Sequence, residues 1–250
     1  MNNRVWVRIA VAAALVCLPV RAPGAVCDLP DYVTQVDGAL SRVPLAVEKE
    51  HKLRVLVVGT GSSALGQEGA MSAYPARLEA ALAAALPKVA IAVSTDIKMR
   101  RTAVEMAAIM GKIAANGKPD LVVWQTGTVD AIRGIDPDVF RDALEAGIRA
   151  ARAAGADVIL VNMQYSPRTE TMIAVQAYAD AMHSVAQQQD VPLFDRLAAM
   201  KHWSESGIFD LAAPNRSRVA EKVHDCLGRA LAELIVQSGK LDRTPSKDRP

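Results

Sequence analysis

A buried parallel strand is predicted by the run Leu53-Arg-Val-Leu-Val-Val-Gly59, which is short, rich in β-branched residues and closed by glycine. It is followed by Gly59-Thr-Gly-Ser62-Ser63-Ala-Leu-Gly66, a turn of glycine and hydroxyl residues. Residues 71–86 are then rich in Ala and Leu at helical spacing, and Pro87 ends that helix. A strand, a turn and a helix in this order indicate the first part of a βαβ unit.

The same alternation continues along the chain. Further strands are predicted at residues 89–94, 121–125, 158–162 and 192–195. Further helices are predicted at residues 102–115, 136–154, 171–189 and 217–237. The first of these helices begins with a capping box made by Thr102 and Glu105. Because βαβ crossovers are right-handed, we expect a three-layer α/β/α fold with a flavodoxin-like parallel sheet of about five strands.

The N-terminus has the order of a secretory signal peptide. Arg4 and Arg8 precede a short apolar run at residues 9–20, and the small residues at 22–25 suit cleavage. A membrane anchor is the first alternative, but a spanning helix needs about 20 apolar residues. A lipoprotein anchor at Cys17 is the second, although large residues precede that cysteine.

These features divide the chain into four segments. They are a signal peptide at 1–25, a lead-in segment at 26–50, one α/β domain at 51–238 and a disordered polar tail at 239–250. We expect the mature protein to be periplasmic or secreted. We expect no stable membrane insertion once the signal is cleaved.

Composition narrows the classes of partner. The chain has 29 Lys and Arg against 27 Asp and Glu, and three of the arginines lie in the expected signal. The mature domain is therefore nearly neutral, which argues against a nucleic-acid partner. Cys27 and Cys226 remain after cleavage, and in an oxidising compartment they can form a disulfide. The alternative is two separate thiols, since a buried free cysteine is ordinary.

Ligands of open α/β sheets bind beyond the carboxyl ends of the strands. The turn after the first strand lacks the ending of a P-loop and the glycine spacing of a dinucleotide site. It is either a serine nucleophile on a sharp turn or a turn that only connects strand to helix. After the fourth strand, Gln164, Tyr165 and Arg168 are candidates to hold a sugar or a carboxylate, although loop polarity alone also explains them.

Several blocks together resemble the SGNH (GDSL-type) hydrolases, in a subgroup common in alphaproteobacteria. The blocks are Val58-Gly-Thr-Gly-Ser-Ser63, Ser72-Ala-Tyr-Pro-Ala-Arg-Leu78, Pro119-Asp-Leu-Val-Val-Trp-Gln-Thr-Gly-Thr128, Ala154-Gly-Ala-Asp-Val-Ile-Leu160 and Gln164-Tyr-Ser-Pro-Arg168. The resemblance implies a serine esterase acting on acyl or acetyl esters of envelope or extracellular glycans. It also implies a nucleophilic serine, a glycine and an asparagine as oxyanion donors, and a histidine in Asp-x-x-His.

This chain keeps only part of that pattern. The serine is Ser62, or Ser63 if the extra residue in the turn shifts the register. The loop after the second strand has no glycine, Val129 replaces the asparagine, and Asp-x-x-His is missing before the last helix. The residues left for the oxyanion or pocket are Gly61, Gly127, Thr128 and Asp130. For Asp130, an ordinary helix-start pair with Arg133 is the alternative.

A base would have to come from one of four histidines. His202 follows the fifth strand at the correct edge, and it is the candidate that we name as catalytic, with a structural role beside Trp203 as the alternative. His51 precedes the first strand and His183 lies in mid-helix. His224 lies about 12 Å along the last helix, at 1.5 Å per residue.

Two functions therefore remain open. The first is an exported serine ester hydrolase with a degraded catalytic set, acting on a small-molecule or glycan ester. The second is a non-catalytic binding or accessory module on the same fold. We expect no cofactor and no metal, because His, Cys and carboxylate residues do not cluster at ligand spacing.

Overall fold

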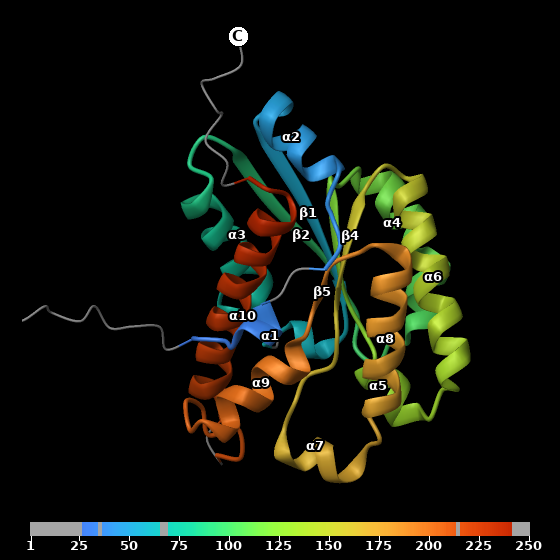
Figure 1. Cartoon of the computed structure of the whole chain (residues 1–250), viewed down its shortest axis with the longest axis vertical. Coiled ribbons are helices and arrows are strands. Elements are labelled where there is room, and N and C mark those ends of the chain that lie inside the picture. The colour runs from blue at the N-terminus through green and yellow to red at the C-terminus, as the bar shows by residue number, and fades with distance from the viewer. Residues whose placement is uncertain (1–26, 35–36, 66–69, 214–215, 242–250) are drawn as a thin grey trace, which may run out of the picture.

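The centre of the molecule is a five-stranded parallel sheet in the order β2-β1-β3-β4-β5. The computed structural model (Figure 1) describes residues 27–34, 37–65, 70–213 and 216–241, so the expected signal peptide lies outside the described residues. The strands are β1 (Lys52–Gly59), β2 (Ala90–Ile97), β3 (Leu121–Gln125), β4 (Asp157–Val161) and β5 (Leu193–Phe194). This strand order is the flavodoxin-like one and confirms the predicted three-layer fold.

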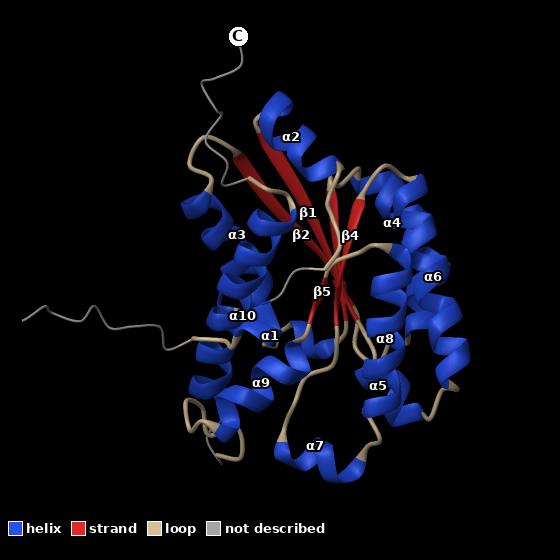
Figure 2. Ribbon diagram, viewed as in Figure 1, coloured by secondary structure: helices blue, strands red, loops and turns tan. Residues whose placement is uncertain are grey.

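Helices cover both faces of the sheet. Figure 2 shows α3 and α10 on one side and α4, α6 and α8 on the other. The helices are α1 (Asp31–Thr34), α2 (Arg42–Glu50), α3 (Tyr74–Ala85), α4 (Ala103–Gly117), α5 (Thr128–Arg133), α6 (Pro137–Ala153), α7 (Pro167–Met172), α8 (Gln176–Gln189), α9 (Arg196–Glu205) and α10 (Arg216–Ser238). The helix predicted at 171–189 is two helices, α7 and α8, and the sequence did not predict α5 and α9.

The alternation of side chains along β1 builds two cores. Leu53, Val55 and Val57 pack on the side of α3 and α10, whereas Leu56 and Val58 pack on the side of α4, α6 and α8. All five side chains are buried, and burial of a Val or Leu contributes about 1.5–3 kcal/mol. A central strand covered on both faces therefore needs the continuous apolar run that the sequence shows.

Local signals set the helix starts. The predicted capping box of α4 is confirmed, because the Glu105 N–H donates to Thr102 Oγ1 and the Thr102 N–H donates to Glu105 Oε2. At the start of α9, Asp195 Oδ1 accepts the N–H of Ala198 at 2.9 Å. Such caps satisfy amide groups that the first helical turn leaves unpaired.

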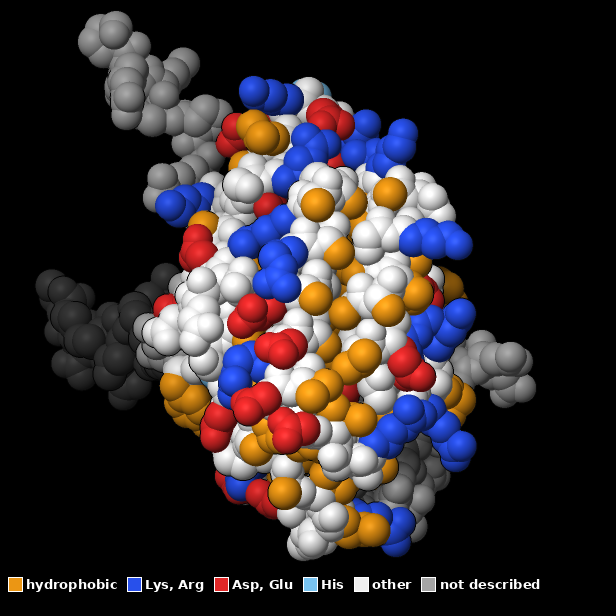
Figure 3. Space-filling view, turned by 90° about the vertical axis from the view of Figure 1, so that its right-hand side faces the viewer, with side chains coloured by type: hydrophobic (Ala, Val, Ile, Leu, Met, Phe, Trp, Pro, Cys, Tyr) orange, Lys and Arg blue, Asp and Glu red, His pale blue; other side chains and the backbone are white. Residues whose placement is uncertain are grey.

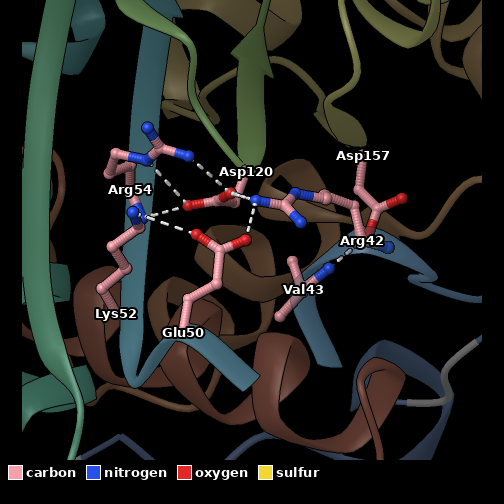
Figure 4. A network of polar contacts seen from close by, with 7 residues as sticks. All are labelled: Arg42, Val43, Glu50, Lys52, Arg54, Asp120 and Asp157. Carbon is pink, nitrogen blue, oxygen red and sulfur yellow. Dashed lines mark hydrogen bonds and ion pairs between the residues drawn. The ribbon is translucent and has the colours of Figure 1, made fainter. Parts of the chain in front are cut away.

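A polar network closes the amino edge of the sheet (Figure 4). The buried Asp120 carboxylate accepts from Arg54 N, Nε and Nη2, and from Arg42 Nη2 at 2.6 Å. Asp157 Oδ2 accepts the N–H groups of Arg42 and Val43, at 2.8 and 2.9 Å, and so caps α2. Two buried carboxylates that precede or begin strands therefore fasten the lead-in helix to the sheet.

Charge is mixed over the helices on the right-hand side of Figure 1. Figure 3 shows Lys and Arg side chains interspersed there with Asp and Glu. Within the described ranges, no helix combines the length and the apolarity that a membrane span requires.

Candidate functional site

The serine turn folds back onto the end of β1. Gly59 ends the strand, and η1 (Gly61–Ser63) follows, with the Ser63 N–H donating to Thr60 O at 2.9 Å. A Cβ on Gly59 would lie 2.4 Å from Ser63 Oγ, so only glycine lets the turn fold this closely. At Gly61 a Cβ would make only ordinary contact with Met99, so the fold does not demand glycine there.

Both serine hydroxyls donate to the side-chain amide of Gln125, at the end of β3. Ser63 Oγ lies 2.9 Å and Ser62 Oγ 3.1 Å from Gln125 Oε1, and Thr60 Oγ1 lies 3.2 Å from it. Ser63 Oγ is also 3.1 Å from the hydroxyl of Tyr74. An amide oxygen accepts a hydrogen bond but does not take the proton at neutral pH. Gln125 therefore accepts a hydrogen bond from each serine but cannot deprotonate either one to make it a nucleophile.

The structure places His224, rather than His202, next to the partners of the serine turn. His202 lies in the last turn of α9, and no hydrogen bond joins its side chain to either serine among the described residues. His224 on α10 is only 5% exposed, and its Nδ1 accepts the Tyr74 N–H at 2.9 Å. His183 instead pairs with Asp195, at 3.1 Å, on the partly exposed face of α8.

The protonation state of His224 makes it a poor base. Burial, assisted by the charge of Arg196, lowers the pKa of His224 to about 3. The ring is therefore neutral at pH 7, and since Nδ1 accepts a hydrogen bond, the single proton lies on Nε2. In this tautomer the ring offers a donor rather than an acceptor.

The turn after β3 is held by hydrogen bonds to the side chain of Asp130. Asp130 is buried and accepts the N–H groups of Ala103 and Gly127 and the hydroxyl of Thr126, at 2.8, 3.2 and 3.3 Å. Burial raises the pKa of Asp130, against these hydrogen bonds. Gly127 has a φ of 100°, and a Cβ there would lie 2.5 Å from Met163 Sδ. The Gly127 N–H is thus directed to Asp130 and not to an oxyanion.

The remaining polar groups of the turn act elsewhere. Thr128 Oγ1 is buried and has no hydrogen-bond partner among the described residues. Arg133 does not pair with Asp130; it donates to Arg100 O at 2.8 Å and lies 3.8 Å from Glu105. The expected pair between Asp130 and Arg133 does not form, because Arg133 points outward, but Asp130 does have a helix-start role, since it caps α4 and α5.

A cavity of about 200 Å³ lies beyond the ends of β4 and β5. Two of the three predicted ligand residues, Gln164 and Tyr165, line it together with Arg196 and His224. The third, Arg168, is exposed on α7 and is not part of the lining. Tyr165 Oη donates to Glu170 at 3.1 Å, so this side chain is already held.

Arg196 is the unusual member of this lining. The side chain is 1% exposed, its Nη1 donates to Ser62 Oγ at a long 3.4 Å, and its Nε has no partner among the described residues. The guanidinium carbon lies 6.0 Å from the centre of the Tyr74 ring. Burial lowers the pKa of Arg196 to about 10, so the group is still a cation at neutral pH.

A family profile matches most of the chain. The profile of the non-GDSL lipase-like family matches residues 26–240. The chain belongs to the non-GDSL lipase-like family. Its serine turn reads Gly59-Thr-Gly-Ser62-Ser63, so it also departs from the Gly-Asp-Ser-Leu sequence that names the larger group.

Several solved structures share the fold of this non-GDSL lipase-like domain. TesA is 24% identical, with a TM-score of 0.58, and 72% of this chain covers 99% of it. Axe2, an acetylxylan esterase from Geobacillus stearothermophilus, is 18% identical, with a TM-score of 0.60, 73% of this chain and 94% of Axe2 being covered. A two-domain esterase active on acetylated mannans is 12% identical, with a TM-score of 0.68 and coverage of 88% and 59%. Among curated proteins, none is similar enough in sequence to count as a relative.

A disulfide joins the two ends of the non-GDSL lipase-like domain. Cys27 and Cys226 are bonded, with a Cα–Cα distance of 5.3 Å across 199 residues of sequence. The Trp203 indole N–H donates to Asp28 O at 3.2 Å and holds the same N-terminal segment on α9. Cys226 lies two residues beyond His224, so the disulfide anchors the part of α10 that lines the cavity.

A wider depression of about 440 Å³ lies beside the disulfide, lined by Cys27, Arg229 and Glu233 among others. No residue of the serine turn lines either cavity, but Arg196, which donates to Ser62 Oγ, lines the smaller one. We place the candidate site of the non-GDSL lipase-like domain in the smaller cavity, because ligands of open α/β sheets bind beyond the strand ends. Among the described residues, no group of three His, Cys, Asp or Glu side chains is placed to hold a metal ion.

Sequence reasoning missed Gln125 and Arg196, and it set His224 aside because of its position along the last helix. Gln125 is a polar residue at the end of an otherwise apolar buried strand, which is a signal that could have been used. Arg196 follows the fifth strand after a single residue, at the edge where ligands bind. His224 carries no such signal, because its place depends on how α10 packs on α3.

Proposed function

We propose that this exported protein is a non-hydrolytic member of its family, a binding or accessory module that holds a small polar ligand at the carboxyl edge of the sheet. The observation that carries the proposal is the serine environment: both hydroxyls donate to the amide oxygen of Gln125, and no base accepts from either among the described residues. A serine without a base within hydrogen-bond reach is a weak nucleophile.

The rest of the site supports the same conclusion. His224 is neutral with its proton on Nε2, Gly127 gives its N–H to Asp130, and the Val129 side chain supplies no donor. Loss of one oxyanion donor costs roughly 10²- to 10³-fold in rate, and loss of a base roughly 10²- to 10⁴-fold. The ligand class that the solved relatives suggest is an acyl or acetyl ester of a small molecule or a glycan.

Ester hydrolysis tests this proposal directly. We expect the mature protein to hydrolyse p-nitrophenyl acetate, acetylated xylan and acetylated mannan no faster than its Ser62→Ala/Ser63→Ala variant. A fluorophosphonate probe should leave both proteins unlabelled, because neither hydroxyl is activated. Axe2 and the two-domain esterase active on acetylated mannans, assayed in parallel, show that the xylan and mannan substrates are competent.

Brisk hydrolysis that is lost in Ser62→Ala would reject the non-hydrolytic role and make this protein a serine esterase. His202→Ala and His224→Ala would then separate the two candidate bases.

Export is the second part of the proposal. It is supported by the order of residues 1–25 and by a disulfide, which is typical of oxidising compartments. We expect N-terminal sequencing of the exported protein to start near Val26. An N-terminus at Met1 in the membrane fraction would contradict export by cleavage.

A further inference from the structure

We propose that the cavity beside Arg196 binds the carboxylate group of a small organic acid. This inference rests on the proposed binding role of the carboxyl edge, and it names a free carboxylate as the ligand in place of the ester that the solved relatives suggest. The cavity has a volume of about 200 Å³, which suits a short aliphatic acid or one sugar acid.

A buried cation without a counter-ion is the first reason. Charged side chains are rarely buried unless they are paired, because transfer from water is costly. No ion pair joins Arg196 to a carboxylate among the described residues, and its Nε donates to nothing. The ring of Tyr74 compensates only in part, since 6.0 Å is the outer limit of a cation–π contact. An anion in the cavity would supply the missing partner.

Arg101 shows that the other strongly buried arginine of this comparison does have a carboxylate partner. Arg101 is also buried, at 7% exposed, but its Nη2 lies 3.1 Å from Asp96. The domain thus pairs one buried arginine with its own carboxylate and leaves the other facing a cavity. A guanidinium is planar and matches a carboxylate with two parallel hydrogen bonds.

The lining indicates a singly charged ligand. Arg196 is the only cation among the described residues that line the cavity, and Asp210 at its exposed rim adds a negative charge. One guanidinium can pair with one carboxylate, and the Asp210 carboxylate would repel the second charge of a phosphate. Gln164 and the neutral His224 ring add uncharged donors, and Met200 gives an apolar wall for the carbon part of the ligand.

Binding of acids and of their neutral amides is the test. We expect acetate, hexanoate and D-glucuronate, followed by NMR at pH 7, to shift the backbone amides of residues 164–166 and 196 of the mature protein. Acetamide, hexanamide and D-glucuronamide should leave them unshifted. A stronger response to hexanoate or to glucuronate tells an aliphatic acid from a sugar acid. Equal binding of acids and amides, no shift with any acid, or tighter binding of inorganic phosphate would overturn the proposal.

Two variants separate ligand binding from a structural role. Arg196→Met should weaken binding of the acids roughly ten- to hundredfold, as for loss of a charge-assisted hydrogen bond. It should keep or raise the melting temperature, because an unpaired buried charge is replaced by an apolar side chain. The matched control, Arg101→Met, should lower the melting temperature and keep the affinity.

A melting temperature that falls for Arg196→Met with unchanged affinity would make Arg196 structural and overturn the proposal. If Arg196→Met does not fold, the comparison of acids with amides on the wild-type protein still decides. The hydrolysis assay is independent of both measurements. Esterase activity would remove the non-hydrolytic role, whereas absence of acid binding would remove only this inference.

Discussion

Reduction of the Cys27–Cys226 disulfide is expected to lower the free energy of unfolding by about 3–5 kcal/mol. The bond closes a loop of 199 residues, almost the whole described domain, and a long closed loop restricts the unfolded chain most. It also fastens α10 near His224, so reduction should broaden the NMR signals of the cavity lining. Urea unfolding with and without a phosphine reductant measures the difference.

The double variant Cys27→Ala/Cys226→Ala is the control for this experiment. It should unfold at the urea concentration of the reduced protein, and the reductant should not change it further. Equal midpoints for oxidised and reduced wild-type protein would show that the disulfide contributes no stability.

Asp120→Asn is expected to lower the free energy of unfolding by about 2–3 kcal/mol at pH 7, as for a broken ion pair that is partly buried. Asp120 is buried and accepts four hydrogen bonds from Arg54 and Arg42, whose side chains are 36% and 30% exposed. An asparagine keeps one acceptor oxygen and turns an NH2 group toward the other donors. Asp138→Asn, on the exposed start of α6, is the matched control and should change stability by less than about 0.5 kcal/mol.

The pH dependence distinguishes a charge effect from a change in packing. Burial alone would raise the pKa of Asp120, but hydrogen bonds from Arg54 and Arg42 outweigh it and hold the pKa below its usual range. Because the folded pKa is the lower one, the stabilisation is complete above the unfolded pKa of about 4 and is lost as pH falls through the folded pKa. The wild-type protein should therefore lose its advantage over Asp120→Asn below about pH 4. A constant difference from pH 7 to pH 2 would contradict this cause.

The fold could be read from the sequence because its determinants are local. The run from Leu53 to Gly59 is apolar at nearly every position, and so it predicts a strand buried on both faces. Thr102 and Glu105 are three residues apart and define a helix start without reference to anything distant. The position of Ser62 and Ser63 at the carboxyl edge follows from the alternation alone, since parallel strands end at one edge.

The short elements were less readable. The β5 strand has two residues, and α9 follows it after a single residue, Asp195. A pattern of this length gives periodicity little to act on, and the Asp195 cap was the usable signal. The sequence therefore did not predict that Arg196 begins a helix and that its side chain lines the site.

What the sequence by itself determined is the layer order, the strand edge at which the serines lie and the loss of an asparagine and a histidine from the family pattern. Only the tertiary structure decided which side chains contact or surround those serines. Gln125 lies 62 residues from Ser63 in the chain, and the two meet because β1 and β3 pair in one register. His224 lies about two turns into α10. Because α10 packs on α3, the ring nevertheless reaches the Tyr74 N–H, and burial there keeps the ring neutral. Periodicity encodes which face of an element is buried, whereas a hydrogen bond between distant segments depends on register and packing that no single segment contains.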